Sequence, residues 1–518
     1  MKKYNQIVKV FAVFTALSVF FACSEDTMDN VNKNKNNPHD TQAKFLVADL
    51  LTNTAFSSVG GDFSLYASIY VEHETGVHNQ MYNAETRNGE PSISTTYNNV
   101  WQSTYANVKH AKIIIEKCTS SVEEVGNEVT LGVAKVMLAY NAAILTDLFG
   151  DVPYFEAGEI NPDMTPKYMQ PKIDKQETIY REIFKLLDEA IVHFDGKDVG
   201  LYGALGNKDF IYGGNAAKWK KAAYALKARY TMRLLNRSAD KTADLNAILD
   251  YVSKSFASAD EEFKFDVYDG DATMNPLCMF SYSRDALGAS VSLIEKFIER
   301  NDPRASQSFM NYYFEQVTDP DEIYSAENGS PQQSQWYYDL SIACYSLTAP
   351  TQLMSYHELL FLKAEALCRL NNNADAKEAL KEAITAGLAN QENTIISAIY
   401  GMEVEAQTDM GSDVADDYFA NDVEPLFDTD PLQETMIQKY LSFFGASGES
   451  IEAYNDYRRL KAADEEFILL TNPKNATQFP LRFSYGVSDV TANMAIKEAY
   501  GDGRYVYTEN IWWAGGTR

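Results

Sequence analysis

Cysteine is scarce in this sequence, with five residues among 518, and no two of them form a CxxC pair. The usual spacing of a zinc site or a thiol-exchange site is therefore missing. An even number of cysteines remains beyond Cys23, and an exported protein could join them as disulfides. Because Cys344 and Cys368 lie in apolar stretches, we expect free buried thiols there and at Cys118 and Cys278.

Positive charge is also in short supply. The sequence holds 45 Lys and Arg against 73 Asp and Glu, a formal net charge of −28. Nucleic-acid binding needs clustered basic side chains, so this class of partner is excluded. The sequence contains no Walker loop, no GxSxG elbow and no dinucleotide-binding fingerprint, so we expect no cofactor.

A zinc-protease motif is approached but not completed at residues 73–78, which read HETGVH. Zinc binding on one helix face needs the second histidine four residues after the first. Val77 stands at that position and His78 comes one residue too late. We therefore expect no catalytic metal at His73 and Glu74.

Long hydrophobic runs are missing after the N-terminus. Lysines there precede an uncharged stretch at 10–22, which is too short to span a bilayer but has the length of a signal-peptide core. Ala22 before Cys23 is similar to a bacterial lipobox, although Phe20 replaces the usual leucine. We expect residues 1–22 to be a signal peptide and Cys23 to be lipidated. An ordinary signal peptide that is cut elsewhere is the alternative.

The stretch after Cys23 favours an anchor. Residues 24–40 are polar with almost nothing to bury, and such a segment stays flexible. Glu25 and Asp26 resemble the signal that sends lipoproteins of Bacteroidetes-type bacteria to the outer face of the outer membrane. We therefore expect a lipidated tether at 23–40 and one large domain at 41–518.

Helical periodicity dominates the rest of the chain. Apolar positions three or four residues apart predict helices at 98–118, 130–148, 177–195, 216–236, 353–370 and 374–386, the last with Gly387 as its C-cap. The final two form an alanine-rich helix–turn–helix unit close to the tetratricopeptide length of about 34 residues. Such units bury their faces by stacking. The predicted fold is mainly α, with tetratricopeptide-like helix pairs in a curved scaffold.

Three segments interrupt the helix pairs. Residues 57–97, 258–350 and 389–435 are rich in Tyr, Asn, Ser, Gly and Asp. Long irregular insertions of this kind are usually functional. Residues 403–434 carry eleven acidic side chains, so we expect an exposed loop there.

Adjacent aromatic residues mark the middle insertion as a candidate binding surface. Trp336, Tyr337 and Tyr338 lie in the polar stretch SPQQSQWYYDL, and adjacent rings cannot all face inward on one element. Exposed rings are good platforms for sugar C–H faces, with nearby polar side chains reaching the hydroxyls. Packing at a loop edge is the alternative. Trp101 and Trp219 differ because they lie in helical stripes, which predicts core positions.

Charged residues in the helices favour structural roles. Glu358 and Glu365 lie on one helix face, and Glu365 has Arg369 four residues later. Ion pairing is preferred there over acid–base chemistry. Arg458 and Arg459 are expected to pair with carboxylates, and phosphate binding is the alternative.

Two acidic clusters raise the question of calcium. They are Asp269-Gly270-Asp271 and the residues from Asp413 to Asp417. Neither follows the EF-hand order of oxygen ligands. We expect solvated loops at both.

Five motifs in order carry a family resemblance. They are LTDLFGDVPYFEA (145–157), KWKKAAYALKARYTMRL (218–234), LMSYHELLFLKAEAL (353–367), AYNDYRRL (453–460) and FPLRFSY (479–485). Together they resemble the SusD/RagB family, in its SusD-like 2 branch, over essentially the whole mature chain. One departure is that Tyr485 is followed by Gly486, where the family usually has proline.

The resemblance implies a function. Members of this family are surface lipoproteins that sit as lids on a SusC-type TonB-dependent outer-membrane transporter and hand it nutrients, most often oligosaccharides. The resemblance thus implies a non-catalytic nutrient-binding domain at 41–518. It also implies that two regions contribute to the ligand site, and the candidate residues there are Tyr82, Arg87, Tyr97, Tyr282 and Arg284. Two alternatives are a protein-interaction scaffold on the repeat surface and a surface glycosidase, which needs two carboxylates across a cleft.

Overall fold

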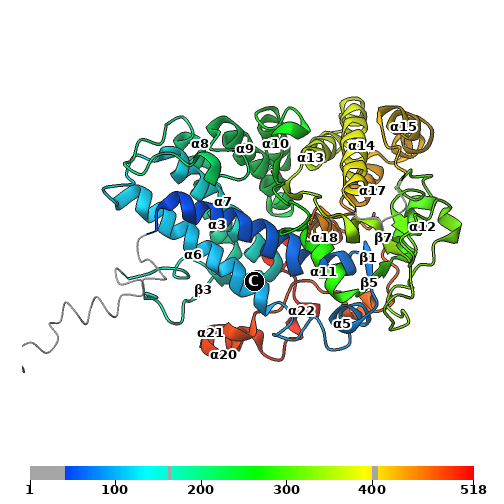
Figure 1. Cartoon of the computed structure of the whole chain (residues 1–518), viewed down its shortest axis with the longest axis horizontal. Coiled ribbons are helices and arrows are strands. Elements are labelled where there is room, and N and C mark those ends of the chain that lie inside the picture. Colours follow the sequence, from blue (N-terminus) through cyan, green and yellow to red (C-terminus); the bar gives the residue numbers. More distant parts are fainter. Residues whose placement is uncertain (1–40, 162–164, 399–406) are drawn as a thin grey trace, which may run out of the picture. The chain divides into compact units, whose positions relative to one another are not determined.

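Long helices that contact their neighbours form the main body of residues 43–518, as Figure 1 shows. The structure is a computed structural model that describes residues 41–161, 165–398 and 407–518. Each helix of the main series contacts the next one. In order they are α6 (Asn98–Ser120), α7 (Glu128–Phe149), α8 (Gln176–His193), α9 (Ala216–Arg233), α10 (Lys241–Ser253), α13 (Tyr356–Arg369) and α14 (Asn373–Ile396). The predicted mainly α architecture of stacked helix pairs is confirmed.

Capping side chains fix where several helices begin. The side chain of Asn215 accepts the backbone N–H of Lys218 at 3.2 Å at the start of α9. Ser355 Oγ accepts the N–H of Glu358 at 3.0 Å at the start of α13. Each bond satisfies an N–H that has no partner within its helix, and such a cap stabilises a helix by about 1 kcal/mol. The prediction that the helix begins at 353 is wrong by three residues, because the chain before Ser355 is a strand.

The α13–α14 pair is the predicted helix–turn–helix unit, and α14 is longer than expected. The prediction that Gly387 is a C-cap is wrong, because α14 continues to Ile396. A Cβ atom at Gly387 would lie 2.8 Å from Oγ of Ser442 at the end of α17 (Pro431–Ser442). Glycine is needed there for the close approach of two helices, and the sequence pattern does not distinguish that role from a cap.

Helix α7 is the centre of the core. In the described chain it is the one helix long and apolar enough to cross a membrane, and 94% of its apolar window is buried within the protein. Helices α3 (Ala43–Asn53), α6 and α8 pack around it. We therefore assign α7 to the core.

Short antiparallel strand pairs join distant segments. Strand β1 (Glu74–Gly76) pairs with β5 (Leu287–Ala289), and β4 (Phe263–Phe265) pairs with β8 (Thr351–Met354). The other two pairs are β2 (Val152–Pro153) with β3 (Ile173–Asp174) and β6 (Phe309–Met310) with β7 (Leu340–Ser341). Of these pairs, β1–β5 joins the middle insertion to the segment after α4, and β4–β8 joins its start to the chain just before α13.

The segment 57–97 is not an irregular insertion, and that prediction is wrong. It contains the π-helix η1 (Thr54–Phe63), α4 (Ser64–Tyr70) and α5 (Asn79–Thr86). Every residue of α4 is buried. Tyrosine misled the prediction because its ring is apolar and its hydroxyl can be satisfied inside a protein.

The acidic segment near residue 420 is also mostly helical. It forms α15 (Ser412–Tyr418), the π-helix η7 (Phe419–Val423) and α16 (Glu424–Thr429) before α17. Phe419, Val423 and Phe427 are buried. The predicted exposed loop is therefore wrong over 412–434, because most of its acidic residues lie on the outer face of these helices and Glu434 is buried in an ion pair with Arg300. Residues 403–406 of that prediction lie outside the described residues.

The C-terminal segment returns to the core helices. The N–H of Phe483 donates to the carbonyl of Leu148 at 2.7 Å, and the hydroxyl of Tyr485 donates to the carbonyl of Asp151 at 2.7 Å. A Cβ atom at Gly486 would lie 2.7 Å from the ring of Trp101. This contact gives a physical reason for the unusual glycine after Tyr485.

Shorter elements complete the fold. The remaining helices are α11 (Pro276–Arg284), α12 (Val291–Ile298), α18 (Ser450–Lys461), α19 (Asn475–Gln478), α20 (Val487–Ala492), α21 (Met494–Tyr500) and α22 (Tyr505–Thr508). The 3-10 turns are η2 (Gly206–Lys208), η3 (Leu235–Arg237), η4 (Ala259–Glu261), η5 (Pro320–Glu322), η6 (Ile342–Tyr345) and η8 (Trp512–Ala514).

Candidate functional site

Exposed aromatic side chains gather in the middle insertion. We call Tyr312, Tyr313, Tyr324, Trp336 and Tyr337 the aromatic platform, and their exposed fractions run from 42% to 76%. The ring centroids of Tyr312 and Trp336 are 5.7 Å apart, and those of Tyr324 and Tyr337 are 5.2 Å apart. Both pairs are edge-to-face, the favoured arrangement of aromatic rings. The platform thus consists of two pairs of solvent-exposed rings, Tyr312 with Trp336 and Tyr324 with Tyr337. The peptide bond between Trp336 and Tyr337 connects the two pairs.

Tyr338 packs beneath the exposed rings as a buried residue in contact with Tyr324. Its side chain is buried with Val77 and Ala326, and its ring is stacked on Tyr324 at 5.4 Å. Its hydroxyl accepts the N–H of Gln332 at 2.8 Å. Tyr338 therefore positions its neighbours and does not itself offer a face to a ligand.

The backbone at Trp336 is held in an unusual conformation. Its φ is +56°, in the left-handed region that non-glycine residues rarely adopt. Its N–H donates to Oδ2 of Asp285 at 2.9 Å, and the side-chain amide of Gln335 donates to the carbonyl of Arg284 at 2.8 Å. Burial raises the pKa of Asp285, and the bond from Trp336 partly opposes that shift. These bonds tie the indole to the end of α11.

Two further candidates lie on α11 beside the platform. Tyr282 is 73% exposed, and Arg284 is an exposed residue at the end of the helix. Because the carbonyl of Arg284 accepts from Gln335, this end of α11 lies next to Trp336. The structure thus brings Tyr282, Arg284, Trp336 and Tyr337 to one region of the surface.

The candidates near residue 90 are placed differently. Tyr97 is fully buried, its hydroxyl lies 2.6 Å from that of Tyr70, and its ring is stacked on Phe483 at 4.2 Å. Arg87 is buried over the Tyr70 ring and donates to Asn475 Oδ1 at 2.9 Å. Burial contradicts a direct ligand role for both.

Tyr82 is the partly exposed member of the group near residue 90. It lies on α5 and is half-buried. It therefore stays a candidate.

Sequence reasoning missed three platform residues. Tyr312 and Tyr313 stand in NYYFEQ, and Tyr324 stands in a stretch with Asp and Glu. The signal that could have found the first two is the one used for Trp336, namely adjacent aromatics in a polar insertion. Nothing local distinguishes Tyr324, which reaches the platform through its backbone bonds to Asp339 at 2.8 and 2.9 Å.

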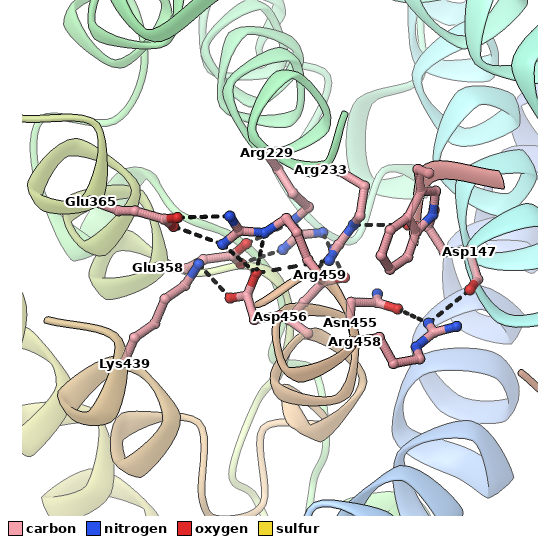
Figure 2. Close-up of polar contacts among 12 residues, drawn as sticks. Asp147, Arg229, Arg233, Glu358, Glu365, Lys439, Asn455, Asp456, Arg458 and Arg459 are labelled. Atoms are coloured by element: carbon pink, nitrogen blue, oxygen red, sulfur yellow. Dashed lines mark hydrogen bonds and ion pairs between the residues drawn. The ribbon is translucent and has the colours of Figure 1, made fainter. Parts of the chain in front are cut away.

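A buried ion-pair network lies between α9, α13, α17 and α18, as Figure 2 shows. Nε of Arg229 donates to Glu358 at 2.7 Å, while Arg459 binds both oxygens of Glu365 at 2.7 and 2.8 Å. Lys439 pairs with Asp456 at 2.7 Å. The predicted structural ion pairing of Glu358, Glu365 and Arg459 is confirmed, and these carboxylates have no free side for acid–base work.

Arg458 departs from its prediction. It was expected to pair with a carboxylate, and instead it donates to the carbonyls of Asp147 at 2.8 Å and Leu481 at 3.0 Å. Its guanidinium lies 4.0 Å from the Tyr454 ring centroid. Burial lowers the pKa of Arg458 to about 10. The side chain joins α18 to the end of α7 and to the C-terminal segment.

His73 and Glu74 are buried, unlike the rings of the platform. Nε2 of His73 is 3.0 Å from the carbonyl of Tyr440. Burial lowers the pKa of His73 to about 3 and raises the pKa of Glu74 to about 8. Both side chains are thus neutral near pH 7, which fits a packing role.

The four described cysteines and the two tryptophans singled out in the sequence are all buried. Cys118, Cys278, Cys344 and Cys368 are free and buried. Trp101 and Trp219 are fully buried, as predicted.

The two acidic clusters are occupied by protein contacts. Oδ1 of Asp269 accepts the N–H groups of Asp271 and Thr273 at 3.0 and 2.8 Å, and Asp416 pairs with Lys381 at 3.0 Å. Among the described residues no group of three or more His, Cys, Asp or Glu could hold a metal ion. Local hydrogen bonds account for the Asp269 turn.

Comparison with known proteins gives the family. The family profile SusD-like_2, described as "Starch-binding associating with outer membrane", matches residues 35–486. No curated protein sequence matches the chain.

Solved structures agree with that match. A SusD/RagB family protein from Bacteroides thetaiotaomicron is 48% identical, with a TM-score of 0.87 over 92% of this chain and 100% of that one. A chitin-binding SusD homologue from Flavobacterium johnsoniae is 18% identical, with a TM-score of 0.66 over 92% of this chain and 99% of that one, and shows the fold alone. The family groups starch- and nutrient-binding proteins associated with the outer membrane. The profile and the 48% identity together show that this chain belongs to the SusD/RagB family, in its SusD-like 2 branch.

Proposed function

We propose that this protein is a non-catalytic surface lipoprotein that captures an oligosaccharide and delivers it to a SusC-type TonB-dependent transporter. The observation that carries the proposal is the aromatic platform. Its rings are 42–76% exposed although each would gain from burial. Sugar C–H faces pack well on such rings, and the exposed Arg284 is near enough to bind hydroxyl groups.

The fixed backbone of the platform supports tight capture. Trp336 is held by its bond to Asp285, and Tyr324 is held by Asp339. Because the backbone that carries these rings is held before a ligand arrives, binding loses less conformational entropy. The platform thus favours recognition of a ligand without requiring a large rearrangement.

The test of capture is calorimetric titration of the protein with a panel of glycans. We expect the Trp336→Ala, Tyr337→Ala double variant to lose about tenfold or more in affinity. Tyr168→Ala is a matched control, because Tyr168 is a 41% exposed tyrosine outside the platform. If the double variant binds every glycan as the wild type does, the platform is not the binding surface.

The anchor is part of the proposal. Residues 1–22 would be removed as a signal peptide, Cys23 would carry lipid, and residues 23–40 would form the tether, all outside the described residues. A multiply acylated cysteine anchors firmly where one chain does not. Cys23→Ala should move the protein from the membrane fraction to the soluble fraction, and retention at the membrane would contradict a lipid anchor.

Delivery and the absence of catalysis need separate tests. We expect a SusC-type transporter to co-purify with the tagged protein from detergent-solubilised membranes. Pure protein should leave the bound glycan intact over long incubation. Turnover that is lost on changing a single carboxylate would establish a glycosidase instead.

A protein-interaction scaffold is the second candidate, and one groove favours it. The groove has a volume of about 630 Å³, lies between α10, α13 and α14, and has Leu249, Phe256 and Leu360 among its lining side chains. Asp375 and Glu378 lie at the same groove. Glu378→Lys changes an exposed residue of the groove, and under this hypothesis it should abolish co-purification of the partner protein and leave glycan titration unchanged.

A further inference from the structure

A second groove lies along α11. It has a volume of about 370 Å³ and is lined by η1, α4, α6 and α11. Phe56, Leu65, Met279 and Phe280 contribute apolar surface to it. A cleft of this size with apolar walls and a few polar groups is typical of a small-molecule site.

Asp62 is the one ionisable side chain among the residues that line this groove. No hydrogen bond or ion pair joins its carboxylate to any other described residue, and burial raises the pKa of Asp62. Across the groove, α6 contributes Asn99, Val100 and Ser103, which carry no charge. A carboxylate in a partly apolar cleft gains most from a cation that a ligand brings.

The backbone next to Asp62 is irregular. Gly61 has φ −89° and ψ −142°, which breaks the π-helix η1 one residue before Asp62. Irregular π-helical turns occur frequently at functional sites. The break separates Asp62 from the regular helical surface, and Gly61 itself lines the groove.

Helix α11 is a shared wall between the groove and the platform. Pro276, Met279, Phe280 and Ser283 line the groove from one helical face. The end of the same helix bonds to the Trp336 segment through Arg284 and Asp285. The helix that lines the groove therefore also holds the segment that carries Trp336.

We propose that the groove binds a protonated amine of the captured ligand, which pairs with Asp62 while its apolar face lies on Phe280 and Leu65. The ligand class is an oligosaccharide with free amino groups. This inference rests on the proposed capture function and adds a charge requirement to it. A neutral glycan would use the platform alone.

The test compares two glucosamine tetramers of the same linkage, one with free amines and one fully N-acetylated. Calorimetric titration at about pH 6 keeps most amines protonated and lies well above the ordinary carboxyl range, which is needed because burial raises the pKa of Asp62. We expect the free amine to bind the wild type about 10- to 100-fold more tightly, and Asp62→Asn to remove that preference. Asp271→Asn is the matched control, because Asp271 is exposed and outside the groove.

The wild type provides a second measurement that needs no variant. Because burial raises the pKa of Asp62, lowering the pH from about 6 toward 4 increases its protonated fraction, so affinity for the free amine should fall while affinity for the acetylated ligand stays constant. Tyr66, one turn along the chain, is the titratable neighbour whose pKa Asp62 helps to raise, and it stays neutral throughout.

The outcomes separate this inference from the capture proposal. Equal affinity for both tetramers, with loss of both in Trp336→Ala, would overturn the amine site and keep capture at the platform. Binding of neither tetramer nor any other glycan would overturn both. A preference for the amine that persists in Asp62→Asn would place the cation site elsewhere and contradict the inference.

Discussion

Two regions of this protein place side chains where they are energetically unfavourable. The ion-pair network between α9, α13, α17 and α18 buries charges, and the aromatic platform of residues 312–337 exposes rings to solvent. In the network, Glu365 is fully buried and both of its oxygens are bound by Arg459. In the platform, Trp336 is 46% exposed, and only its backbone is tied to the protein. A group whose bonding capacity is satisfied inside the protein can only stabilise the fold. A group held in place with its face open is available to a ligand.

The largest expected effect comes from removing a carboxylate from the ion-pair network. Glu365→Ala should lower the free energy of unfolding by about 3–5 kcal/mol, because the buried Arg459 loses its bidentate partner and retains only Asp456. Glycan affinity of the folded fraction should stay at the wild-type value. Chemical denaturation and titration of the same sample measure both quantities.

The control for that change is a glutamate of an exposed pair. Glu177→Ala removes the partner of Arg181, and the two side chains are 47% and 72% exposed. Such pairs contribute less than about 1 kcal/mol. If both variants lose equally little stability, the network does not stabilise the fold as argued.

Acid should also distinguish the two regions. Burial opposes ionisation of Glu365, but Arg459 and Arg369 outweigh it and lower its pKa below 4.5. A lowered carboxyl pKa gives stability that is present above the unfolded value and lost as the pH falls. Burial raises the pKa of Asp285 at the platform, so its contribution has the opposite sign.

We therefore expect the free energy of unfolding to fall by about 1–3 kcal/mol between about pH 6 and pH 3. Glu358 and Asp147 offset part of this loss, because burial raises the pKa of each. Glu365→Gln should flatten the fall, and Asp285→Asn should not. Denaturation curves over this pH range measure the slopes, and an unchanged slope in Glu365→Gln would contradict the assignment.

The smallest expected effects concern Tyr97 and Tyr282, two tyrosines that the sequence analysis names equally as candidate ligand-binding residues. Tyr97→Phe removes a buried hydroxyl bond and should cost about 1 kcal/mol of stability without changing glycan affinity. Tyr282→Ala should cost less than about 0.5 kcal/mol and weaken glycan binding about two- to fivefold. Thermal denaturation and titration measure the pair, and weaker binding in Tyr97→Phe would argue against this division.

The helices were predictable because their signal is local. Apolar spacing located α6, α7, α8, α9 and α13 to within a few residues. The same rule failed over 57–97, since α4 is buried on all sides and has no polar face to set a period. It also failed at Gly387, where the reason for glycine is Ser442 on another helix.

The candidate site was predictable in part for the same reason. Adjacent aromatics at Trp336 and Tyr337 in a polar stretch indicate exposure, and both rings are exposed. Tyr324 gave no local signal, because its position depends on backbone bonds to Asp339. The groove at Asp62 could not be predicted for the same reason, since its walls come from four separate elements.

The sequence by itself determined the helix class, the ion-pair partners within a helix such as Glu365 and Arg369, and the motifs of the family. These depend on residues a few positions apart, which the chain holds close in any helical state. Only the tertiary structure decided that Tyr97 is core while Tyr282 is surface. Burial depends on what the rest of the chain places against a side chain, and for Tyr97 that is Phe483 from the far end of the sequence.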